Sequence, residues 1–238
     1  MTTLRIDLES FSSVDLKKCG AHKYVESDDF EVLLFGYAFD DEPVQVVDLA
    51  SGEELPSRVL EALEDPAVTK AAYNAAFEIA CLSRHFGYPM PVEQWRCTSV
   101  HALYLGLPGN LGDVARVVGN DNQKMSGWQL IRFFCLPCKP TKTNHGRTRN
   151  LPKHDPAKWA RFKQYCAADV EAEREIARKD QRRIEMALKL AHFPVIRDLE
   201  GFDFAAQPSI DAKQIRDLAA GRHDLAAVPA EQRRRRDL

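Results

Sequence analysis

The chain lacks several features that would assign a protein directly to a class. It has no glycine-rich phosphate loop, no nucleophile elbow and no convincing Ser-His-Asp arrangement, which argues against an ATPase or a serine hydrolase. No apolar run approaches the roughly 20 residues of a membrane helix, and no secretory signal is recognisable. The 33 Lys and Arg residues and 35 Asp and Glu residues give a net charge of −2, so no global polyanion-binding signature exists. We expect a cytoplasmic protein that binds neither membranes nor ATP.

Cysteine is present but does not form a regular framework. Without a secretory signal, the six cysteines indicate a reduced, cytosolic setting rather than disulfides. Cys135 and Cys138 form one Cys-x-x-Cys pair with His145 nearby, which leaves structural zinc as an alternative. That alternative would need a further ligand from His154 or Cys166.

Three short acidic segments, far apart in the sequence, carry the main functional signal. Asp7 and Glu9 lie two residues apart in a predicted strand, so their side chains share one side of it. Tyr165 and Asp169 lie four residues apart in a predicted helix and share one helix face. Carboxylates brought together repel one another unless cations lie among them, and oxygen ligands suit Mg²⁺ or Mn²⁺. The three segments are residues 6–10, 73–78 and 165–169.

The apolar pattern and the helix-boundary residues predict an α/β chain. Asn110, Ser126 and Asp155 are the expected N-caps of three helices, and Gly87 the end of another. The predicted strands are residues 4–9, 32–39, 44–48, 68–73 and 95–98. The predicted helices are residues 56–64, a segment from 75 that ends by Gly87, 99–105, 110–118, 126–135 and a long one from Asp155.

The order Asp-x-Glu, Asn-x-x-x-acid and Tyr-x-x-x-Asp resembles the DEDD superfamily of 3′–5′ exonucleases, in its tyrosine subgroup. The likeness covers residues 1 to about 180 and is greatest to the exonuclease domain of phage-like family A DNA polymerases. One departure is Glu78, where the second motif usually ends in aspartate. The resemblance implies an RNase H-like (DnaQ-like) exonuclease fold, with a mixed five-stranded sheet flanked by helices.

The resemblance also implies the roles of five catalytic residues around two Mg²⁺ or Mn²⁺ ions. Asp7 would bridge both ions, with Glu78 and Asp169 completing the ligand shell. Glu9 would bind one ion and approach the 3′-hydroxyl group. Tyr165 would orient the nucleophilic water, although simple packing of its ring is the alternative.

The implied reaction is release of nucleoside monophosphates from a DNA 3′ end, as in a proofreading domain without its polymerase. An RNA 3′-end exoribonuclease would use the same five residues. The sequence shows no residue that would recognise a 2′-hydroxyl group and so distinguish RNA from DNA. A catalytically decayed nucleic-acid-binding remnant is the other alternative. Any polymerase or replication partner is unknown.

Residues 124–163 hold ten Lys and Arg residues against one acidic residue, with aromatic residues, Trp128 among them, interleaved. A solvated helix face would explain this composition, but residues 139–149 form a basic, non-periodic segment that suits phosphate contacts along a single strand. Asn74 either caps a helix or contacts substrate. The predicted substrate-binding residues are Asn74, Lys139, Lys142, Arg147 and Arg149.

The C-terminal quarter differs from the rest. Residues 181–222 resemble a helical fragment of IstB-type transposition helpers, most clearly at residues 202–209, but no G-x-x-x-x-G-K-[ST] motif follows. Residues 223–238, in which Ala and Arg are the commonest residues, are predicted to be a disordered basic tail.

Overall fold

The computed structural model describes residues 2–117, 127–190, 211, 213, 215 and 216. The chain divides into two compact units, Met1–Glu185 and Met186–Leu238. The predicted boundary at about residue 180 falls within one helix, α7 (Pro156–Leu190). The predicted tail and most of the IstB-like segment lie outside the described residues. The sheet and all of the predicted catalytic residues belong to the first unit.

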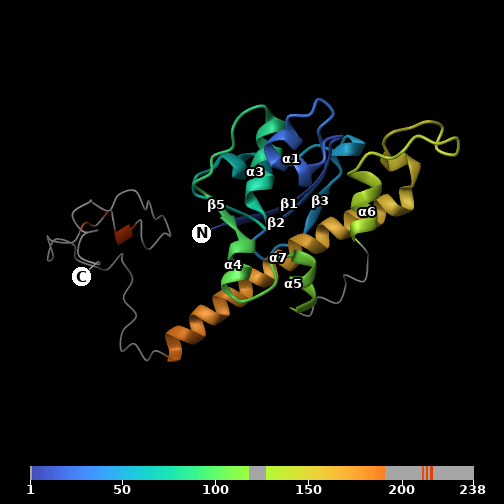
Figure 1. Cartoon of the computed structure of the whole chain (residues 1–238). Coiled ribbons are helices and arrows are strands. Elements are labelled where there is room, and N and C mark those ends of the chain that lie inside the picture. Colours follow the sequence, from blue (N-terminus) through green and yellow to red (C-terminus); the bar gives the residue numbers. More distant parts are fainter. Residues whose placement is uncertain (1, 118–126, 191–210, 212, 214, 217–238) are drawn as a thin grey trace, which may run out of the picture. The chain divides into compact units, whose positions relative to one another are not determined.

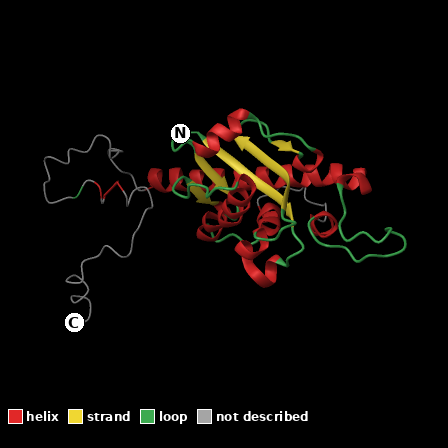
Figure 2. Ribbon diagram, turned by 90° about the horizontal axis from the view of Figure 1, so that it is seen from above, coloured by secondary structure: helices red, strands yellow, loops and turns green. Residues whose placement is uncertain are grey.

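A mixed five-stranded sheet forms the centre of this unit (Figure 2). The strand order is β3-β2-β1-β4-β5, in which β1–β2 and β2–β3 are antiparallel and β1–β4 and β4–β5 are parallel. This arrangement confirms the predicted mixed five-stranded sheet and the RNase H-like fold. The strands are β1 (Thr3–Phe11), β2 (Glu31–Phe39), β3 (Gln45–Val47), β4 (Thr69–Ala72) and β5 (Trp95–Cys97).

The predicted helices are present, together with one that was not predicted, α1 (Leu16–Val25). It is polar, and Gly20 interrupts it with φ 78° and ψ 169°, so the sequence offers no helical period across this segment. The other helices are α2 (Ser57–Glu64), α3 (Ala75–Phe86), α4 (Thr98–Tyr104), α5 (Leu111–Val117) and α6 (Gly127–Phe134), with short 3₁₀ turns η1 (Leu49–Ser51) and η3 (Pro152–His154).

The helix boundaries follow the capping residues. The Asn110 side chain accepts from the backbone N–H groups of Gly112 and Asp113, and Asp155 accepts from that of Lys158. Gly87 ends α3 in the left-handed conformation, with φ 77°. The remaining predicted cap, Ser126, lies outside the described residues.

Helices cover the sheet in two layers (Figure 1), and each layer packs on the sheet through an apolar core of its own. One core packs α1 and α3 against β1 residues such as Leu4, Ile6 and Leu8. The other packs α6 and α7 against Phe11 and its neighbours on β2. The second core fixes α7 along the strand that carries Asp7 and Glu9. Among the described residues, no helix combines the length and the apolar character needed to cross a membrane.

Candidate metal centre

Three carboxylates from two distant segments meet at one point of the fold. Asp7 and Glu9 come from β1 and Asp169 from α7, and their ligand oxygens all lie within 4.8 Å of one another. The two-residue spacing on a strand turns Asp7 and Glu9 to the same side of the sheet. The structure thus brings together three of the four residues that the sequence predicts as metal ligands.

Glu78, the fourth predicted ligand, lies in the first turn of α3 and is 5% exposed. Its Oε2 atom and the Oδ2 atom of Asp7 are buried without a hydrogen-bond partner. A buried carboxylate oxygen without a donor is costly. A cation among these side chains would remove that cost, so the unpaired oxygens fit a metal site.

Burial and mutual repulsion oppose ionisation of this cluster. Burial raises the pKa of Asp7 to about 7, and the charge of Glu173 adds to the effect. Burial also raises the pKa of Glu9 well above its ordinary value, as do the charges of Asp7 and Asp169. A divalent cation would offset both effects, because a nearby opposite charge favours the ionised form of a carboxylate. The all-oxygen ligand set suits hard ions such as Mg²⁺ or Mn²⁺.

Tyr165 lies one turn before Asp169 on α7. Burial raises the pKa of its phenol, the charge of Asp169 raises it further, and a hydrogen bond to Asp169 acts in the same direction. The ring stacks on Phe162, with centroids 6.3 Å apart and planes 8° from parallel. Tyr165 therefore keeps its proton at neutral pH, which suits a group that orients a water molecule rather than a base.

Two buried thiols contact the residues of β1 that form the cluster. Cys135 Sγ donates to Glu9 Oε2 at 3.7 Å, and Cys166 Sγ donates to the backbone oxygen of Asp7 at 3.8 Å. Cys138 Sγ instead donates to the backbone oxygen of Arg147 at 3.4 Å. Cys135 and Cys138 thus face different surroundings, and within the described part of the chain no cysteine belongs to a group that could hold a metal. The zinc alternative has no support there.

Glu173 is a further buried carboxylate, which the sequence analysis missed. It is 2% exposed, and its Oε1 atom accepts from Thr98 Oγ1 at 2.8 Å. Burial raises its pKa to about 7, and its charge raises the pKa of Asp7. The available signal was its spacing, because Glu173 follows Asp169 by four residues and Tyr165 by eight, and so shares their helix face.

Three of the predicted substrate-binding residues are exposed. Asn74 occupies the N-cap position of α3, but its side chain makes no capping hydrogen bond. Lys139 and Lys142 lie in the segment between α6 and α7. On α6, Trp128 is 54% exposed, and Lys17 Nζ lies 5.1 Å from its ring centroid.

The two predicted arginines make contacts within the protein. Arg147 Nε donates to Asn150 Oδ1 at 3.0 Å. Arg149 forms an ion pair with Glu31 at 2.5 Å, and its guanidinium lies 4.0 Å from the ring centroid of Phe11. Both arginines therefore help to hold the segment between α6 and α7 in place.

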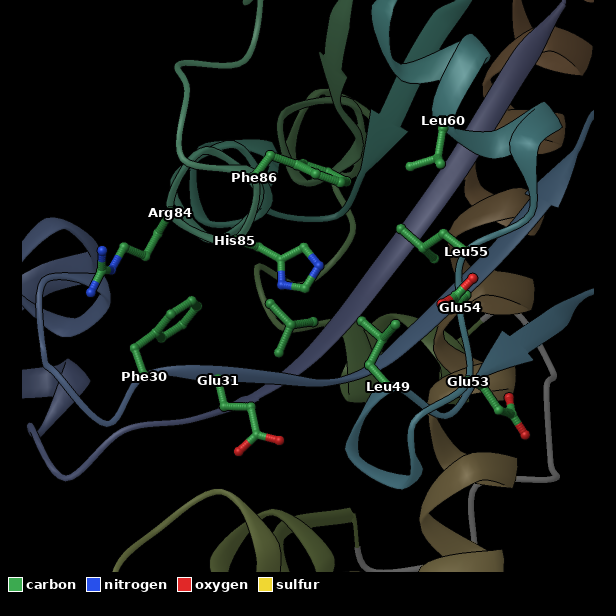
Figure 3. A pocket seen from close by; sticks show the side chains of 11 residues that line it. Phe30, Glu31, Leu49, Glu53, Glu54, Leu55, Leu60, Arg84, His85 and Phe86 are labelled. Atoms are coloured by element: carbon green, nitrogen blue, oxygen red, sulfur yellow. The ribbon is translucent and has the colours of Figure 1, made fainter.

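A cavity of about 580 Å³ lies apart from the carboxylates, between the start of β2, the end of α3, η1 and α2 (Figure 3). Figure 3 shows His85 pointing toward the middle of this cavity, among Leu49, Leu55 and Phe86. None of the five predicted catalytic residues lines it. The predicted chemistry does not belong to this cavity.

Comparison with known proteins reveals two separate similarities along the chain. The first is to the DNA polymerase of Bacillus phage SP02, which is 57% identical over 177 residues, or 74% of this chain and 27% of the polymerase. The chain thus spans about a quarter of the length of that relative. The predicted resemblance to phage DNA polymerases is confirmed.

The second similarity concerns the C-terminal part. Residues 158–224 match the family of IstB-like ATP binding proteins. The insertion sequence IS5376 putative ATP-binding protein of Geobacillus stearothermophilus is 44% identical over 46 residues, or 19% of this chain and 18% of that protein. The predicted resemblance to IstB-type proteins is confirmed, and the match begins inside α7, ahead of Tyr165.

Two solved structures match this chain at low sequence identity. Escherichia coli RNase D, an exoribonuclease involved in structured RNA processing, is 16% identical, with a TM-score of 0.48 covering 77% of this chain and 40% of that one. Brucella melitensis NrnC bound to pGG is 14% identical, with a TM-score of 0.41 covering 78% of this chain and 74% of that one. The RNase H-like fold of this chain is defined by the strand order of its sheet, β3-β2-β1-β4-β5.

Proposed function

We propose that this chain is a metal-dependent 3′–5′ exonuclease that removes nucleoside monophosphates from DNA 3′ ends. One observation carries the proposal: the ligand oxygens of Asp7, Glu9 and Asp169 lie within 4.8 Å of one another, and buried oxygens of Asp7 and Glu78 have no partner. The 57% identity with a phage DNA polymerase supports DNA as the substrate.

Each residue of the site has a chemical task in this proposal. Asp7, Glu9, Glu78 and Asp169 would hold two Mg²⁺ or Mn²⁺ ions, which when bound would acidify a water molecule and offset the charge that develops on the phosphate. Tyr165 keeps its proton and orients the water through its hydroxyl group. Asp169 fixes that hydroxyl group by accepting its hydrogen bond.

The surface near α6 offers contacts for a single strand. Trp128 is exposed beside Lys17, and an exposed aromatic ring next to cations suits base stacking combined with phosphate contact. Lys139 and Lys142 are exposed cations in the segment that follows α6. We assign the phosphate contacts to these lysines rather than to Arg149, whose guanidinium already pairs with Glu31.

The test uses a 5′-labelled single-stranded DNA oligonucleotide and a matched RNA, each incubated with Mg²⁺ or Mn²⁺. The expected result is a ladder that shortens from the 3′ end of the DNA and disappears with EDTA and in Asp7→Ala. Asp28→Ala, an exposed aspartate outside the site, is the matched control and should keep full activity.

Two outcomes would overturn the proposal. Faster shortening of the RNA than of the DNA would make the chain an exoribonuclease. Intact DNA and RNA in every lane, from folded protein that still binds the strand, would make it a nucleic-acid-binding remnant.

A further inference from the structure

Gly127, the first residue of α6, lies directly against the ring of Tyr165. A Cβ atom built on Gly127 would lie 2.6 Å from Tyr165 Cζ and 2.8 Å from Cδ2. Real Cβ atoms essentially never approach other atoms so closely, so any side chain at position 127 would displace the ring. The Cζ atom carries the phenol oxygen, so a displacement would move the hydroxyl group.

The backbone gives no reason for glycine at this position. Gly127 belongs to an α-helix, whose backbone conformation an alanine adopts without strain. Alanine is also a better helix former than glycine. The reason for the missing side chain is therefore the space that it leaves for the tyrosine.

Other contacts hold Tyr165 and α6 against each other. Tyr165 stacks on Phe162, which stacks in turn on Phe134 of α6, with centroids 5.4 Å apart and planes 18° from parallel. Just beyond the other end of α6, Cys135 donates to Glu9. The segment from Gly127 to Cys135 thus lies against Tyr165 at its start and contacts Glu9 at its end.

We propose that Gly127 is a positioning residue, whose lack of a side chain sets the place of the Tyr165 hydroxyl group at the carboxylate cluster. Its kinetic consequence, a lower kcat, rests on the proposed function. Its structural consequence, a displaced tyrosine ring, does not depend on that function.

The kinetic test is a double-mutant cycle of Gly127→Ala and Tyr165→Phe on single-stranded DNA with Mn²⁺. Gly127→Ala should lower kcat roughly tenfold to a hundredfold, because small misplacements at a reacting centre are that costly. Its Mn²⁺ affinity, measured by calorimetry, should stay within about twofold of wild type, because no ligand moves. In the Tyr165→Phe background the same substitution should change kcat by less than about twofold, because the hydroxyl group is already absent.

Gly109→Ala is the matched control, since a Cβ atom there meets only Leu103 Cδ2 at 3.7 Å, an ordinary contact. It should leave kcat unchanged. Equal losses from Gly127→Ala in both backgrounds would overturn the proposal, because the glycine would then act through the fold of α6 and not through the hydroxyl group. An unchanged kcat in Gly127→Ala would overturn it as well.

A crystal structure of Gly127→Ala separates this proposal from the proposed function. The expected result is a Tyr165 ring rotated away from α6, with Asp7, Glu9 and Asp169 in place. A ring in its original position would overturn the inference even if wild type is an active nuclease. A wild-type protein without nuclease activity would refute the proposed function. The crystal structure would still show whether Gly127 sets the position of the Tyr165 ring.

Discussion

Gly36 of β2 and Cys166 of α7 are packed so closely that a Cβ atom on the glycine would lie 2.7 Å from the cysteine sulfur. Gly36 is also the β2 partner of Asp7 in the antiparallel pair with β1. The bare backbone of Gly36 therefore lets α7 approach the sheet beside Asp7. That approach brings Asp169, one turn after Cys166, within reach of the β1 carboxylates.

Gly36→Ala should lower both the metal affinity and the stability of the fold. The added methyl group would push α7 away from β1, so we expect a Mn²⁺ affinity lower by about tenfold and a free energy of unfolding lower by roughly 1–3 kcal/mol. Calorimetric titration with Mn²⁺ and thermal unfolding measure the two effects. Adding Cys166→Ala removes the nearest clashing atom and should restore part of both losses, and a double variant no better than Gly36→Ala would refute this explanation.

Without metal, the fold should become less stable as the pH rises from about 4 to about 7. Burial raises the pKa of Asp7 from 3.8 to about 7 and that of Glu173 from 4.5 to about 7. The folded state thus binds more protons than the unfolded chain in this window, so the free energy of unfolding falls with rising pH. In EDTA, we expect a Tm at pH 8 lower than at pH 5 by roughly 5 °C or more. Mn²⁺ at pH 8 should recover most of the difference.

Asp7→Asn is the control for that experiment. It removes one of the titrating groups, so its Tm in EDTA should fall less between pH 5 and pH 8, and Mn²⁺ should stabilise it less. A wild-type Tm that rises over the same interval would show that these carboxylates ionise without cost in the folded state.

Glu173→Gln should move metal binding to lower pH. The charge of Glu173 raises the pKa of Asp7, and a neutral amide removes that contribution while it can still accept from Thr98. Asp7 would then ionise at lower pH, so the acid side of the Mn²⁺ affinity profile should shift downward by roughly half a pH unit. Glu175→Gln is the matched control, because Glu175 pairs with Arg178 at 3.3 Å and should leave the profile unchanged. An upward shift in Glu173→Gln would contradict the assignment.

Lys142→Ala and Arg149→Ala should separate substrate contact from structural support. Lys142 is exposed, so its loss should weaken single-stranded DNA binding and reduce the salt dependence of log K by about 0.7, without changing Tm. Arg149 pairs with Glu31 and lies over Phe11, so its loss should lower Tm by a few degrees. Fluorescence anisotropy across a salt series measures DNA binding by the two variants, and thermal unfolding measures their Tm. An unchanged salt dependence in Lys142→Ala would exclude it as a phosphate contact.

The sequence by itself identified the carboxylates of the candidate site, because their spacing is local. A two-residue period on a strand places Asp7 and Glu9 together, and a four-residue period on a helix places Tyr165 and Asp169 together. The apolar pattern predicted all five strands, since alternation and turn residues are also local signals. α1 was missed because its polar composition and the break at Gly20 hide the helical period.

The tertiary structure alone decided how these local pieces meet. Neither Gly36 nor Gly127 has a sequence signature, because each is required by a side chain more than 35 residues away. The hydrogen bonds from Cys135 to Glu9 and from Thr98 to Glu173 likewise join segments that no period relates. Spacing along a strand or helix fixes which side chains share a face, whereas the distance between α7 and β1 depends on packing across the core. The close packing of α7 on β1 brings Asp169 to Asp7 and Glu9, and only the tertiary structure determines it.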